Sequence, residues 1–131
     1  MNILLDTHIY IWFTENNSQL SPMSRMLIED EANEKFISLV SFYKIAIKTK
    51  IGKLEMSKSI RACISELKSY DISLLPVSES HISFYDAVPL VENHRDPFDR
   101  LIIATAYYEN LAILTADKQF DNYTALVSIL H

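Results

Sequence analysis

Ile3-Leu4-Leu5-Asp6-Thr7, near the start of the chain, indicates the fold class of this sequence. Three consecutive apolar residues, with no polar residue among them, are typical of a strand that is buried on both faces. Asp6 and Thr7 follow at once and favour a helix start, because a side-chain oxygen there can accept a hydrogen bond from a free backbone N–H. A buried strand that leads directly into a helix is typical of a parallel sheet with helices on both faces.

The same alternation of strands and helices continues along the chain. Ser21-Pro22 and Asp96-Pro97 indicate helix starts, because the first residue can cap the helix and proline fits its first turn. We expect further strands at 36–40, 72–77, 112–114 and 126–130, and helices from 7, over 22–33, 41–51 and 57–69, from 78, and over 97–110. No repeat or linker interrupts this pattern, so we predict a single α/β domain over residues 1–131.

The composition excludes several kinds of binding site. The 131 residues include one glycine, Gly52, whereas dinucleotide-binding turns, P-loops and the hydrolase nucleophile elbow each need more than one. The formal net charge of −5 argues against a protein that binds nucleic acid through bulk positive charge. An enzyme that holds a phosphodiester through bound cations is compatible with this charge.

The single cysteine and the apolar pattern indicate the cellular compartment. Cys63 can form no internal disulfide and has no cysteine neighbours for a zinc site, so we expect a small buried side chain in a reducing cytosol. The first residues carry no basic leader segment, and no apolar run reaches about 18 residues. We therefore expect a cytoplasmic protein with no membrane span.

Three aspartates are placed where they can meet. Asp6 and Asp117 each follow a predicted strand, and parallel sheets bind ligands beyond the carboxyl ends of their strands. Asp99 shares a helix stripe with Ile102 and Ile103, so its charge needs a buried partner. Each acid also has an ordinary alternative role, as a helix cap, a helix N-terminal charge or a turn residue. If all three meet in one crevice, they repel one another, and a divalent cation relieves that repulsion.

Four motifs in series carry a resemblance to a known family. They are Leu4-Leu5-Asp6-Thr7-His8, Ser41-Phe42-Tyr43-Lys44-Ile45-Ala46-Ile47-Lys48 followed by Gly52-Lys53-Leu54, Asp96-Pro97-Phe98-Asp99-Arg100-Leu101-Ile102-Ile103-Ala104, and Thr115-Ala116-Asp117. In this order and spacing the chain resembles a PIN-domain protein of the VapC toxin type. The resemblance implies a three-layer α/β/α sandwich with a mainly parallel central sheet. It also implies a Mg²⁺- or Mn²⁺-dependent ribonuclease that forms homodimers and is inhibited by a cognate antitoxin protein.

The resemblance further implies a catalytic site, position by position. Asp6 matches the first family acid, Asp99 the third and Asp117 the fourth, so these three are the implied catalytic and metal-ligating residues. The carboxylates would hold divalent ions that activate a water for in-line attack on phosphorus. The candidate outer-shell groups are Asp96, Thr115 and Asp121. Their ordinary alternatives are a helix cap, a strand residue and a surface position respectively.

Lys44 departs from the family pattern, which has Glu at this position. We expect Ser41 to cap the helix, which places Lys44 in the first turn, where a positive charge costs about 0.3–1 kcal/mol. Lys44 either bends outward into solvent or pairs with Asp6 or Asp99 in the crevice. In the second case the site attracts divalent cations less than a four-acid site does. We then predict that at most one ion is held firmly and that nuclease activity is low or absent.

Basic residues are concentrated close to this position. Six of the twelve lie between 44 and 61, and Lys48, Lys50 and Lys53 are candidates for contact with RNA. A solvated helix face is the alternative interpretation of these lysines.

Three functions compete at this point. The leading hypothesis is a metal-dependent endoribonuclease that is the toxin of a type II toxin–antitoxin pair. The alternative is a catalytically inactive PIN-like domain that retains antitoxin or RNA binding. A receiver-type signalling domain is disfavoured, because the predicted strand 36–40 offers no acceptor aspartate at its end.

Overall fold

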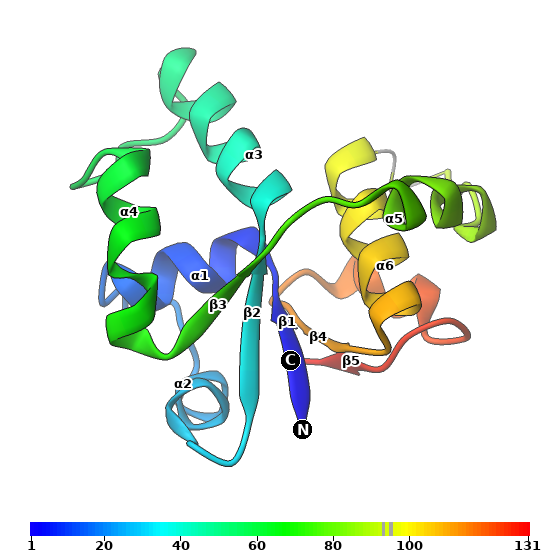
Figure 1. The fold of residues 1–131 in the computed structure, drawn as a ribbon, viewed down its shortest axis with the longest axis horizontal. Helices are drawn as coiled ribbons and strands as arrows, with labels where there is room; N and C mark the ends of the chain where they lie inside the picture. Colours follow the sequence, from blue (N-terminus) through cyan, green and yellow to red (C-terminus); the bar gives the residue numbers. More distant parts are fainter. Residues whose placement is uncertain (93, 95) are drawn as a thin grey trace.

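A computed structural model describes residues 1–92, 94 and 96–131 and contains a five-stranded sheet flanked by helices (Figure 1). The strand order is β3-β2-β1-β4-β5, and every neighbouring pair is parallel. The strands are β1 (Asn2–Leu5), β2 (Glu34–Ser38), β3 (Ile72–Leu75), β4 (Ala112–Leu114) and β5 (Ile129–Leu130). The helices are α1 (Thr7–Thr14), α2 (Pro22–Glu29), α3 (Leu39–Lys50), α4 (Ile60–Glu66), α5 (Glu79–Phe84) and α6 (Pro97–Glu109). Short 3₁₀ helices are η1 (Leu67–Tyr70), η2 (Tyr85–Ala87) and η3 (Lys118–Tyr123).

The sheet is buried on both faces because apolar residues alternate between two cores. Ile3 and Leu5 belong to the core under α1, α2, α3 and α4, whereas Leu4 belongs to the core under α6. Figure 1 shows α1, α2 and α4 on one side of the sheet and α5 and α6 on the other, with α3 above the sheet. These layers confirm the predicted α/β/α sandwich with a parallel central sheet.

The strand order places a crevice next to β1. Leu5 pairs with Ile37 of β2 on one side and with Leu114 of β4 on the other, so the chain winds in opposite directions away from β1. Such a switch point opens a crevice at the carboxyl ends of the two central strands. The backbone N–H of Asp6 donates to the carbonyl of Leu114 at 2.9 Å, which fixes the two strand ends against each other.

The boundary between β2 and α3 differs from the predicted one. We predicted a strand over 36–40 and a helix capped by Ser41, but β2 ends at Ser38, whose hydroxyl accepts from the N–H of Val40 at 3.2 Å. Ser38 has extended backbone angles and is the N-cap of α3. Ser41 instead lies in the first turn of the helix, is fully buried, and accepts a hydrogen bond from the Thr7 hydroxyl at 2.9 Å. Its hydroxyl therefore links α1 to α3.

The last strand is also shorter than predicted. The N–H groups of Leu126 and Val127 both donate to the carbonyl of Tyr123, so this part of the chain completes the turn after η3. β5 contains Ile129 and Leu130, which pair with Ile113 and Leu114 of β4, and the Ser128 carbonyl before it accepts from the N–H of Ile113 at 2.9 Å. The prediction of a strand from 126 was therefore wrong at its start.

Three other features of the sequence can be described in the structure. Gly52 follows α3 with a φ of +78°, a left-handed conformation that only glycine adopts without strain. Cys63 is buried, and burial raises the pKa of its thiol, so the side chain stays protonated in the core. Among the described residues, no helix has the length and apolar character needed to span a bilayer.

Candidate metal centre

Asp6 is held at the carboxyl end of β1 by two hydrogen bonds. One oxygen of its carboxylate accepts from the N–H of Thr7 at 2.8 Å, which caps α1, and the other accepts from the hydroxyl of Thr115 at 2.8 Å. Burial, followed by the charge of Asp99, raises the pKa of Asp6 to about 6. The Asp6 carboxylate is therefore crowded by a like charge in a site with little water.

Asp96 and Asp99 lie together at the start of α6. Asp96 is the N-cap, and its Oδ1 accepts from the N–H groups of Phe98 and Asp99 at 2.9 and 3.4 Å. Asp99, one turn into the helix, is 6% exposed, and its Oδ2 lies 2.8 Å from Nε2 of His94. The buried partner that the apolar stripe required for Asp99 is thus present.

Lys44 points into the crevice rather than into solvent. Its Nζ lies 2.8 Å from Oδ2 of Asp96 and 3.2 Å from Oδ1 of Asp99, and the residue is 7% exposed. Burial alone would lower the pKa of the ammonium, but the hydrogen bond to Asp96 and the charge of Asp99 raise it above its ordinary value. Lys44 is therefore a permanent internal cation.

The structure confirms one part of the Lys44 prediction and corrects another. Lys44 pairs with Asp99, one of the two partners predicted for it, and its other partner is Asp96, which was not predicted in that role. Lys44 also lies in the second turn of α3, since Ser38 and not Ser41 caps that helix. The expected penalty from the helix dipole therefore does not apply, because this effect fades beyond the first turn.

Asp117 completes a group of side chains that fits a cation. One ligand atom each from His94, Asp99 and Asp117 lies within 4.8 Å of the others. Ligands at about 2.1 Å from Mg²⁺ are at most about 4.2 Å apart, so a small inward movement would bring these atoms into range. His94 Nδ1 is buried and has no hydrogen-bond partner among the described residues. The two carboxylates suit Mg²⁺ or Mn²⁺, whereas an imidazole is a ligand more typical of Zn²⁺ and other transition metals.

The sequence model of the PIN domain matches residues 3–126. This chain belongs to the PIN domain family. The family match confirms the resemblance carried by the four motifs, and it decides against a receiver-type domain.

Individual proteins similar to this PIN domain include a ribonuclease and VapBC proteins. Ribonuclease VapC22 of Mycobacterium tuberculosis is 23% identical over 124 residues, which cover 92% of this chain and 91% of that protein. The structure of VapBC2 from Rickettsia felis, bound to a DNA fragment from its promoter, is similar with a TM-score of 0.67 and 17% identity, over 98% of this chain and 97% of that chain. VapBC-1 from nontypeable Haemophilus influenzae gives a TM-score of 0.63 and 20% identity, over 98% and 96% of the two chains.

The candidate outer-shell residues of the PIN domain have separate positions. The Thr115 hydroxyl, fully buried, donates to Asp6 and accepts from the N–H of Asp117 at 3.0 Å, so it connects the first and last acids. Asp96 binds Lys44 as described. Asp121 is exposed and lies 2.7 Å from Nε2 of His131, outside the group that fits a cation.

The candidate RNA-contact lysines follow Lys44 along α3 and beyond it. Lys48 is partly buried in the last turn of the helix, whereas Lys50 and Lys53 are exposed. Burial, followed by the charges of Lys48 and Lys44, lowers the pKa of His8 on α1. Lys48 is thus electrostatically coupled to the α1 side of the crevice, while the other two extend away from it.

The structure brings to the candidate site two residues that the sequence interpretation did not include. His94 contacts Asp99, and Arg100 donates from Nη2 to the backbone carbonyl of His94 at 2.7 Å. Neither residue gives a periodic signal, because His94 precedes the helix and Arg100 looks like a surface charge. A histidine five residues before an aspartate at a helix start was the one available sign.

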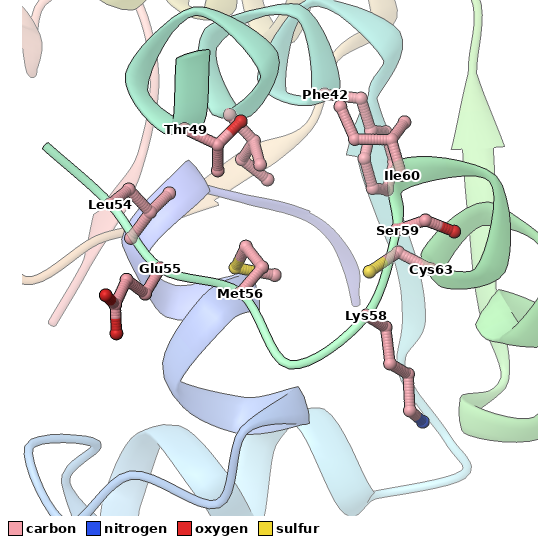
Figure 2. Close-up of a pocket in the computed structure, with 10 residues that line it drawn as sticks. Phe42, Thr49, Leu54, Glu55, Met56, Lys58, Ser59, Ile60 and Cys63 are labelled. Atoms are coloured by element: carbon pink, nitrogen blue, oxygen red, sulfur yellow. The ribbon is translucent and has the colours of Figure 1, made fainter. Parts of the chain in front are cut away.

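A separate hollow lies between α3, α4 and the connection between them (Figure 2). It has a volume of about 340 Å³, and its lining includes Phe42, Met56 and Cys63. In Figure 2 the charged ends of Glu55 and Lys58 point away from its centre. This hollow contains none of the clustered acids, so it is not the candidate metal centre.

The raised pKa of Asp6 predicts how stability changes with pH when EDTA keeps the protein metal-free. Above about pH 6 the buried Asp6 carboxylate is charged in the folded protein, and this charge lowers the free energy of unfolding. Between about pH 6 and 3.8 the Asp6 carboxyl binds a proton in the folded state but not in the unfolded state, so the loss of stability disappears as pH falls through this range. Asp6→Asn should therefore raise the free energy of unfolding at neutral pH by up to about 3 kcal/mol and leave it unchanged near pH 3.8. Urea unfolding at both pH values checks this. The exposed Asp117→Asn is the control, and an equal effect of both variants would contradict the assignment.

Proposed function

We propose that this PIN domain is a divalent-cation-dependent endoribonuclease and the toxin of a toxin–antitoxin pair. The observation that carries the proposal is the convergence of His94, Asp99 and Asp117 at the carboxyl edge of the sheet, within 4.8 Å of one another. The crowding of Asp6 supports it, since a nearby cation would relieve the unfavourable charge. The similarity to Ribonuclease VapC22 favours RNA as the substrate.

His94, Asp99 and Asp117 would hold Mg²⁺ or Mn²⁺, with Asp6 beside them. Such an ion polarises the scissile phosphate and lowers the pKa of the water that attacks phosphorus. Side chains of the protein would orient the acids and attract the RNA. Thr115 fixes the orientation of the Asp6 carboxylate, and the contact with His94 does the same for one oxygen of Asp99. Lys48 and the exposed lysines after it would attract the RNA backbone.

Lys44 sets the strength of cation binding in this proposal. The four aspartates of the crevice and one ammonium leave a formal charge of −3, with His94 neutral. A glutamate at position 44 would make it −5. Because Lys44 already neutralises part of Asp96 and Asp99, we infer that one cation at most binds firmly and that catalysis is slow.

The partners belong to the same proposal. The similar structures include toxin–antitoxin complexes from Rickettsia felis and Klebsiella pneumoniae, which favours an antitoxin protein as the partner of this chain. A homodimer in the cytoplasm is the assembly that the resemblance implies. Size-exclusion chromatography of the chain with and without the product of a neighbouring short reading frame would identify both partners.

Cleavage of RNA is the decisive test of the function. We expect slow endonucleolytic cleavage of single-stranded RNA with added Mn²⁺, complete loss in EDTA, and at least about a hundredfold loss in Asp6→Ala, because the ion and its ligands supply several kcal/mol of transition-state stabilisation. Asp86→Asn, at an exposed acid of η2, should retain full activity.

The alternative function predicts a different result. An inactive PIN-like domain would bind RNA or antitoxin without any cleavage in Mn²⁺, and its RNA binding would be unaffected by Asp6→Ala. Cleavage that persists in EDTA and is lost in Asp6→Ala would contradict both functions, because the chain would then be a metal-independent nuclease.

A further inference from the structure

An aromatic pocket lies directly beside the clustered acids. His8, Trp12 and Ala116 line it together with Asp6 and Asp117, and its volume is about 220 Å³. His8 and Trp12 are four residues apart on α1, so their side chains lie on the same face of that helix. The centroids of their rings are 5.9 Å apart, with the planes inclined at 52°.

The pocket continues along α1 away from the acids. His8 and Trp12 also line a second hollow of about 550 Å³, whose opposite wall is the segment around Met56. This wall is tied to α1, because the N–H and hydroxyl of Ser57 donate to the two carboxylate oxygens of Glu15 at 3.0 and 2.7 Å. The two hollows share the aromatic pair, and therefore form one path that leads from the acids along α1.

The chemistry of this path suits a nucleobase better than a phosphate. His8 is exposed, and Trp12 is half-buried with one part packed against the core. An open aromatic surface offers no positive charge that could bind a phosphate, but it provides a face on which an unpaired base can stack. Because the net charge of the chain is −5, the protein as a whole does not attract RNA electrostatically. Base stacking would therefore contribute binding energy that the net charge does not supply.

We propose that Trp12, with His8 beside it, is a stacking site for the unpaired base next to the phosphate that would be cleaved at the clustered acids. The inference rests on the proposed ribonuclease function and adds the site that positions the nucleotide. Double-stranded RNA fits this site poorly, because its bases are already stacked on one another.

Trp12 is the only tryptophan of the sequence, so its own fluorescence reports on the pocket. In EDTA, which prevents cleavage, a short single-stranded oligoribonucleotide should quench the fluorescence in a saturable way. Polyphosphate and an abasic oligomer of equal charge should leave it unchanged, and an RNA duplex should quench it much less. These three probes separate stacking from binding by charge.

Substitution gives the second measurement. Loss of one stacked base predicts that Trp12→Ala weakens RNA binding by about 5- to 150-fold, as measured by anisotropy of a labelled oligomer. Trp12→Phe should restore much of the affinity and also shows whether the alanine variant merely fails to fold. Tyr108→Ala, which removes an exposed ring from α6, should bind RNA as the unsubstituted chain does.

The results distinguish this inference from the function on which it rests. RNA that binds by anisotropy with unchanged Trp12 fluorescence and equal affinity for Trp12→Ala would overturn the stacking site and leave the ribonuclease proposal intact. A chain that binds no RNA, and cleaves none in Mn²⁺, would overturn both.

Discussion

Replacement of Lys44 by Glu is expected to raise the rate of RNA cleavage in limiting Mn²⁺ by about a hundredfold or more, since it changes the charge of the site by two units. Two unit charges about 4 Å apart interact by about 4 kcal/mol at an effective dielectric constant of about 20. Screening removes part of this energy, yet about 2.7 kcal/mol is enough for a hundredfold change. The side chain of Lys44 contacts both Asp96 and Asp99, so its charge acts directly on the acids.

A charge reversal one turn later on the same helix is the matched control. Lys48→Glu changes the net charge equally, but Lys48 makes no ion pair with the acids among the described residues. It should weaken RNA binding and leave the Mn²⁺ requirement unchanged. Faster cleavage by both variants would mean that net charge, rather than the Lys44 contact, controls the site.

The second large effect concerns folding. Lys44→Met removes the ammonium that pairs with Asp96 and Asp99, so Asp99 keeps only His94 as a partner and Asp96 only the backbone N–H groups of α6. Loss of one partner of a buried ion pair typically costs about 3–5 kcal/mol. We expect the free energy of unfolding in EDTA at neutral pH to fall by about this amount. Denaturant titration measures it, and added Mn²⁺ should restore part of the loss by binding the folded state.

Two further variants make this result specific to the pair. Asp99→Asn in the Lys44→Met background should recover stability, because it removes the buried charge that has lost its partner. Lys35→Met is the matched control: Lys35 is equally buried, but its partner Asp71 is exposed and can be solvated. Equal losses for Lys35→Met and Lys44→Met would contradict the account.

The sequence predicted much of the fold because its local signals agree with the tertiary structure. The continuous apolar run of β1 and the caps at Ser21, Ser78 and Asp96 were all interpreted correctly. The junction of β2 and α3 was misplaced by three residues, since Ser38 and Ser41 are both good caps by residue type. The sheet register, in which Ser38 pairs with Leu75, favours the first, and that register is a long-range property that local patterns do not contain.

The candidate site also contains residues that the sequence indicated and contacts that only the structure shows. Asp6, Asp99 and Asp117 were identified from their places at strand and helix ends, and the structure brings them to one edge of the sheet. The pairing of Lys44 with Asp96 spans 52 residues, and His94 contacts Asp99 from a position before the start of α6. Neither contact has a periodic signature, because His94 lies outside any helix or strand and the Lys44–Asp96 pair depends on how α3 and α6 pack against each other. That packing could be found only in three dimensions.

The most direct test is a calorimetric titration of metal-free protein with Mn²⁺, with Lys44→Glu measured beside the unsubstituted chain. We predict at most one firmly bound ion for the unsubstituted chain and at least about a hundredfold tighter binding for Lys44→Glu, and Asp99→Asn should weaken binding in both. Equal Mn²⁺ affinity of the two chains would contradict the central claim that the Lys44 ammonium occupies part of a cation site.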